Sequence, residues 1–210
     1  MTTRTVFLDA LGTTVELDSP WTHLAKALGV EADKELVGAV RNEMAFYKEH
    51  AHEGVDEAAL INLRARCADL LSFELDREVP VQTMMDSIRF QAAADAAGAI
   101  ASLRARGLAL ICVSNWDISL PEVLERCGLG DAFDAVVTSA GSGARKPDPA
   151  IFTPALELAG CEPAEALHVG DTAEEDVAAA RAAGIPCLLL DRAGGGDIAS
   201  LVEIEEHLSS

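Results

Sequence analysis

The sequence predicts an α/β fold in which a doubly wound parallel sheet carries an inserted all-helical segment. Three observations predict it. Short apolar runs recur along the chain, segments with helical periodicity alternate with them, and one long helical stretch interrupts the alternation near the N-terminus. Strands that alternate with helices form parallel sheets, because the connecting helices cover the faces of the sheet.

The apolar runs are the predicted strands. None of them alternates apolar with polar residues, as a half-exposed antiparallel strand would. Continuous apolar runs of this length are typical of strands that are buried on both faces. The runs lie at residues 5–8, 108–113, 135–137, 167–169 and 187–190.

The segments between these runs are predicted helices, and two of them end at Gly107 and Gly184. Glycine favours the left-handed conformation that closes many helices. The stretch from residue 19 to about 89 shows only helical periodicity, with apolar stripes within 36–44, within 60–71 and after Pro80. We therefore expect a core domain formed by residues 1–16 and 92–210, and a helical cap formed by residues 17–91.

The composition excludes several classes of function. Sixteen lysines and arginines against thirty-five acidic residues give a net charge of −19, which repels nucleic acids and anionic membranes. No apolar run approaches the roughly 20 residues that span a bilayer, and the N-terminus lacks the pattern of a signal peptide. We expect a cytoplasmic protein, monomer or homodimer, that binds a small anionic substrate, a phosphate ester.

The five cysteines are predicted to be small buried residues, because they include no Cys-x-x-Cys pair and no neighbouring histidine at metal-ligand spacing. One alternative is open. Cys112 lies in a predicted strand that leads to polar residues, and it is therefore a candidate nucleophile.

Polar residues follow the predicted strands at the points where ligands bind in open α/β sheets. Asp9 follows the first run, Ser114 the second and Asp171 the fourth, while Lys146 and Asp176 lie further beyond the strands. Taken singly, each has an ordinary explanation as a helix cap or a turn residue. Together, three carboxylates and one ammonium leave a charge of about −2, which a hard divalent cation with oxygen ligands would neutralise.

Four segments, in order, resemble the motifs of the haloacid dehalogenase (HAD) superfamily. They are VFLDALGT at 6–13, VSN at 113–115, KPDP at 146–149, and VGD at 169–171 continuing to Asp176. The helical insertion resembles the type 1 cap of subfamily IA in that superfamily. The resemblance implies a HAD-type, Rossmann-like core.

The resemblance also implies catalytic roles. Asp9 would be the nucleophile that forms a covalent aspartyl intermediate. Ser114 would donate a hydrogen bond to the transferring group, and Lys146 would neutralise charge on the nucleophile and on that group. The residues implied in substrate binding are Gly12, Thr13 and Asn115.

A magnesium site is implied in the same way. Asp9 and Asp171 would hold Mg²⁺ directly, with the backbone carbonyl of Leu11 as a further ligand and Asp176 as ligand or outer support. The cation would clamp the substrate and neutralise its charge.

Leu11 is where the sequence departs from this pattern. Phosphatases of the superfamily carry a second aspartate at this position as general acid and base, and leucine cannot transfer a proton. Such catalysis contributes about 10²–10⁴-fold. We expect a Mg²⁺-dependent phosphatase of a small phosphorylated metabolite, with weak activity unless a cap residue supplies the proton; the candidates are Lys48, His50 and His52.

Other functions are open. Asp9-Ala10-Leu11-Gly12-Thr13 resembles the first motif of 2-haloacid dehalogenases, in which halide leaves without a proton, although these enzymes lack an acidic residue equivalent to Asp171 and use no metal. The Gly12-Thr13-Thr14 sequence resembles the Mg²⁺-dependent phosphonoacetaldehyde hydrolases, which need a cap lysine. A phosphate-binding protein with little turnover is the third alternative.

Overall fold

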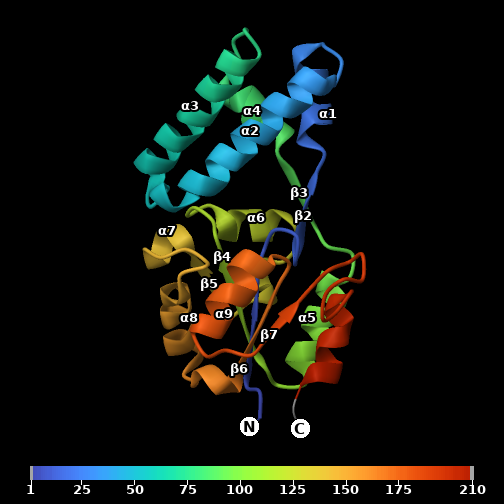
Figure 1. Cartoon of the computed structure of the whole chain (residues 1–210), viewed down its shortest axis with the longest axis vertical. Helices are drawn as coiled ribbons and strands as arrows, with labels where there is room; N and C mark the ends of the chain where they lie inside the picture. Colours follow the sequence, from blue (N-terminus) through green and yellow to red (C-terminus); the bar gives the residue numbers. More distant parts are fainter. Residues whose placement is uncertain (1, 209–210) are drawn as a thin grey trace.

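The computed structural model describes residues 2–208 and has the predicted α/β architecture (Figure 1). A five-stranded sheet has the order β5-β4-β1-β6-β7, and every neighbouring pair is parallel. The strands coincide with the predicted apolar runs to within about a residue at most ends. They are β1 (Thr5–Leu8), β4 (Ala109–Ser114), β5 (Ala135–Thr138), β6 (Ala166–Gly170) and β7 (Cys187–Leu189).

Helices cover both faces of this sheet. Val6 and Leu8 point to one face and pack with one set of helices, whereas Phe7 points to the other face and packs with the second set. The first set comprises α5 (Ala96–Ala105), α6 (Leu120–Arg126) and the C-terminal 3₁₀ helix (Leu201–His207). The second comprises α8 (Phe152–Ala159) and α9 (Ala178–Ala182), while α7 (Ser139–Ser142) follows β5. Burial on both faces explains why the strands are apolar without alternation.

The inserted segment forms four helices with an apolar core of their own. They are α1 (Pro20–Leu28), α2 (Lys34–His50), α3 (Glu57–Glu74) and α4 (Val81–Ser87). Figure 1 shows them at the opposite end of the molecule from both termini, beyond α6. Within residues 2–208, no helix combines the length and the apolar character needed to cross a membrane.

Two further strands join the helical insertion to the rest of the chain. β2 (Val15–Asp18) and β3 (Arg89–Ala92) pair as an antiparallel ribbon. This ribbon has no clear signal in the sequence, because both strands are short and partly exposed and contain no continuous apolar run. The ribbon ties the chain entering the insertion to the chain leaving it.

Candidate active site

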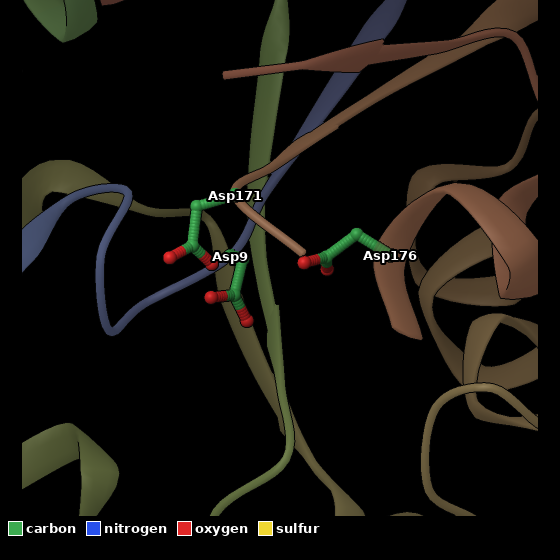
Figure 2. Close-up of side chains that lie close together, drawn as sticks. All are labelled: Asp9, Asp171 and Asp176. Atoms are coloured by element: carbon green, nitrogen blue, oxygen red, sulfur yellow. The ribbon is translucent and has the colours of Figure 1, made fainter. Parts of the chain in front are cut away.

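Three aspartates that are distant in sequence converge at the carboxyl edge of the sheet. Asp9 follows β1 and Asp171 follows β6, while Asp176 lies in the helical segment Ala173–Val177. One carboxylate oxygen from each lies within 4.8 Å of the others. Figure 2 shows Asp9 and Asp171 side by side, with Asp176 directed toward them from a separate segment. A chain with oxygen ligands at this spacing can hold a hard cation.

Lys146 is the buried cation of this cluster, with a relative exposure of 1%. Its Nζ donates hydrogen bonds to Asp9 Oδ1 at 2.6 Å, to Asp176 Oδ1 at 2.6 Å and to the carbonyl of Val113 at 3.0 Å. All three ammonium protons therefore have acceptors. The side-chain amide of Asn115, a residue implied in substrate binding, donates to the backbone carbonyl of Lys146 and accepts from its backbone N–H. These two hydrogen bonds fix the position of the Lys146 backbone.

Opposing effects set the protonation of these groups. Burial alone would lower the pKa of Lys146, but Asp9 and Asp176 raise it above its usual value. Burial would raise the pKa of Asp176, but Lys146 and His168 hold it well below its usual range. Burial also raises the pKa of Asp9, and Lys146 opposes that rise. The cluster is therefore an ionised lysine bridging two carboxylates.

Asp171 is the carboxylate that Lys146 does not contact. Desolvation, together with the charges of Asp9 and Asp176, raises its pKa to about 6. The site thus holds more negative charge than one lysine can neutralise. A divalent cation between Asp9 and Asp171 would remove this excess, so the donor set fits such an ion.

Asp176 is held by donors on both of its oxygens. Oδ1 bonds His168 Nε2 at 2.9 Å in addition to Lys146, and Oδ2 accepts from the backbone N–H of Thr172 at 3.1 Å. This geometry suits Asp176 to supporting Lys146. The sequence analysis missed His168, whose signal is a histidine inside the apolar run of β6.

Two glycines allow the loops to approach the carboxylates closely. A Cβ at Gly12, whose φ is 83°, would overlap the carboxylate of Asp171, and a Cβ at Gly170 would overlap that of Asp176.

Thr13, implied in substrate binding, is fully buried, and its hydroxyl has no hydrogen-bond partner among residues 2–208. Thr14 donates to the carbonyl of Asp9 at 2.9 Å, which braces the turn after β1.

A cavity of about 380 Å³ extends from the carboxylate cluster into the helical insertion. Its sheet end is lined by Asp9, Leu11, Ser114, Lys146 and Asp171. Its walls in the insertion are largely apolar and include Leu24, Val40, Met44, Leu71, Met84 and Met85. Leu11 lines the cavity with an apolar side chain and is 39% exposed.

The protein matches the family model of haloacid dehalogenase-like hydrolases over residues 3–184. The chain belongs to that family. Its five-stranded parallel sheet and helical insertion have the same architecture as a dehalogenase with an intermediate complex, with a TM-score of 0.75 and 19% identity over 100% of this chain and 98% of the other. At that identity the likeness shows the fold alone.

Curated relatives of this hydrolase align over part of their length. The haloacid dehalogenase-like hydrolase domain-containing protein 3 of Bos taurus is 48% identical over 96 residues, covering 44% of this chain and 38% of the relative. A phosphoserine phosphatase of Thermus thermophilus is 37% identical over 120 residues, covering 57% of this chain and 48% of the relative. The aligned part is thus less than half of each relative.

Of the cap residues considered as proton donors in this HAD-like hydrolase, only Lys48 lines the cavity among residues 2–208. Its Nζ pairs with Glu175 at 3.2 Å. His50 instead bonds the carbonyl of Phe46 at 2.8 Å and stacks on the Phe46 ring, and His52 lies outside the cavity lining.

Cys112 is not suited to act as the nucleophile of this hydrolase. It is fully buried in β4, and burial raises the pKa of its thiol far above the usual value. A thiol reacts as the thiolate, so Cys112 stays inert.

The hydrolase has a cap-to-core contact that the sequence analysis missed. The hydroxyl of Tyr47 in α2 donates to Asp117 Oδ2 at 2.7 Å. Burial and the Asp117 charge raise the pKa of Tyr47 well above its usual value, so it remains a donor. Both residues line the cavity, which this contact helps to close.

Proposed function

We propose that this hydrolase is a Mg²⁺-dependent phosphatase of a small phosphorylated metabolite and that it acts through an aspartyl-phosphate on Asp9. The observation that carries the proposal is the arrangement of Asp9, which contacts Lys146 on one oxygen and lies beside the unneutralised Asp171. A nucleophilic carboxylate, a buried cation and a second carboxylate at one cavity match phosphoryl transfer, in which positioning and charge stabilisation do most of the work. The phosphoserine phosphatase among the relatives supports this substrate class.

Four residues of the site have separate roles in this proposal. An oxygen of Asp9 forms a bond to phosphorus while the bond to the ester oxygen breaks, and water then hydrolyses the acyl phosphate. Lys146 stabilises the negative charge on Asp9 and on the phosphoryl oxygens, and Ser114 donates a hydrogen bond to one of these oxygens. Asp176 holds Lys146 in place.

Metal binding is assigned to Asp9 and Asp171, with the carbonyl of Leu11 as a further ligand. When bound there, Mg²⁺ supplies neutralisation of the phosphoryl charge. The charges of Asp9 and Asp176, which contribute to raising the pKa of Asp171 to about 6, support this assignment, because the same negative charge attracts a cation.

Leu11 determines which leaving groups the site can release. We propose that leucine stands here in place of the acid and base aspartate of related phosphatases. The leaving alkoxide then takes its proton from water or from a cap residue such as Lys48, and turnover of esters with poor leaving groups is slow.

The test is hydrolysis of a panel of phosphate esters with Mg²⁺ and with EDTA. We expect turnover that EDTA abolishes and that Asp9→Asn removes. The matched control is Asp69→Asn, which alters an exposed aspartate of α3 outside the cavity. Absence of turnover with every ester, or turnover that is indifferent to EDTA, contradicts the proposal.

A second candidate is carbon–halogen hydrolysis, which the exposed apolar Leu11 favours because halide leaves without a proton. The charge of Asp171 weighs against it. Chloride release from 2-chloropropionate without added metal would support this candidate. Binding of Mg²⁺ and a phosphate analogue with no hydrolysis would instead indicate a phosphate-binding protein with little turnover.

A further inference from the structure

Among the described residues, the part of the cavity that lies in the cap is lined by one carboxyl group, that of Glu43. This residue lies on α2 and lines the cavity, yet its relative exposure is only 5%. The neighbouring walls are apolar, with Val40 one turn before it and Leu71 on the facing helix α3. A carboxyl group in such surroundings is unusual, since acidic residues are almost never fully buried unless they are paired.

Glu43 has little compensation within the protein. No ion pair among residues 2–208 includes it, and the polar side chain that lies against it is the thiol of Cys67. Thiols are weak donors. Burial raises the pKa of Glu43, and no cation in the described part of the chain offsets that effect. The carboxyl therefore carries a desolvation cost that packing does not explain.

The cavity connects this carboxyl to the catalytic end of the site. Lys146 and Asp171 line its sheet end, and Glu43 lines the part in the cap together with apolar side chains and Arg64 of α3. A ligand that extends from the carboxylate cluster into the cap would meet both apolar walls and a hydrogen-bond acceptor.

We infer that Glu43 binds a hydrogen-bond donor, a protonated amine or a hydroxyl, on the substrate's organic group. The inference rests on the proposed function and narrows its substrate class. The substrate is a phosphate monoester whose organic group is mainly apolar and carries such a donor. Glu43 is the residue that selects it, because only a ligand with a donor satisfies the buried carboxyl.

The test uses alkylphosphonates of increasing chain length, which resist hydrolysis and end in a methyl, a hydroxyl or an amino group. Their affinities are measured by calorimetry with Mg²⁺ present. At the chain length that fits best, we expect the amino or hydroxyl compound to bind at least about tenfold more tightly than the methyl compound, as expected for a hydrogen bond to a carboxylate.

Three variants test whether Glu43 causes the preference for a ligand with a hydrogen-bond donor. Glu43→Leu is expected to lose the preference for the donor and to bind the methyl compound at least as well as before. Glu43→Gln keeps an acceptor oxygen without the charge, so it is expected to keep the preference for hydroxyl and to weaken that for amine. Glu35→Leu alters an exposed glutamate of the same helix and serves as the matched control.

The outcomes separate this inference from the proposed function. Equal affinity of the three compounds, or a preference that survives in a folded Glu43→Leu protein, overturns the inference. If the protein hydrolyses no ester but its preference for the donor depends on Glu43, this supports the inference about Glu43 and contradicts the proposed phosphatase activity. Failure of every phosphonate to bind overturns both.

Discussion

Replacing Lys146 by methionine would remove the ammonium group that contacts both Asp9 and Asp176. Breaking a buried ion pair from one side costs about 3–5 kcal/mol, because the remaining charge loses its partner but stays desolvated. For a chain of this size, each kcal/mol lowers Tm by about 2–4 °C. Lys146→Met is therefore expected to lower Tm by about 6–20 °C in the absence of metal.

The pH dependence of this loss follows from Asp176. Its folded-state pKa is held below the unfolded value, so its ionic contribution is present above the ordinary aspartate pKa and is lost as the pH falls below it. The difference in Tm between the two proteins should thus be complete near about pH 7 and shrink below about pH 4. Mg²⁺ should raise the Tm of Lys146→Met more than that of the unaltered protein, since it restores positive charge.

The assay is thermal unfolding followed by circular dichroism across this pH range, with and without Mg²⁺. Lys34→Met, which alters an exposed lysine at the start of α2, is the control. A Tm loss no larger than that of the control, or a difference that stays the same at acidic pH, would refute the electrostatic account of the site.

Three further changes test other parts of the structure. Leu11→Asp is expected to raise kcat for esters with poor leaving groups by up to about 10²-fold and to affect p-nitrophenyl phosphate less; equal gains would show that proton transfer is not limiting. Asp95→Asn is expected to cost about 2 kcal/mol near neutral pH in urea unfolding. Burial opposes ionisation of Asp95, but Arg192 and two further donors hold its pKa at about 2, so the cost should vanish as the pH falls from about 4 toward 2; a cost that persists in acid contradicts this. Tyr47→Phe leaves the buried Asp117 without its hydroxyl donor and is expected to lower stability by about 1–3 kcal/mol in the same assay, and an unchanged stability would mean that this contact is absent in solution.

The sheet was predictable from the sequence because strands that are buried on both faces are continuous apolar runs. Val6 and Leu8 point to one face and Phe7 to the other, yet all three are apolar, which is typical of a strand covered on both sides. The ribbon of β2 and β3 contains no such apolar run. Its strands are short and partly exposed, so their pairing follows from the placement of the cap rather than from local sequence.

Convergence of Asp9, Asp171 and Asp176 was predictable for a similar reason, since parallel strands end at one edge of a sheet and Asp176 follows closely after β6. The roles of His168 and Glu43 were not predictable. Each is a polar residue in a largely apolar segment, and only the packing of neighbouring elements decides whether it faces solvent, a partner or a cavity. Sequence periodicity assigns a face to a residue but does not say what lies opposite.

Leu11 links the stability of the site to its chemistry. An aspartate there would add a carboxylate at a cavity that already holds Asp9 and Asp171, and each close pair of like charges costs about 1–4 kcal/mol at the dielectric of water or of a protein surface. Leucine avoids that repulsion, but it cannot transfer a proton during catalysis. The Leu11→Asp protein should therefore be less stable than the unaltered one without metal and should recover with Mg²⁺, even as its turnover rises. A gain in turnover with no loss of metal-free stability would show that the charge at this edge of the sheet is screened by solvent, and the need for a cation would then rest on the substrate alone.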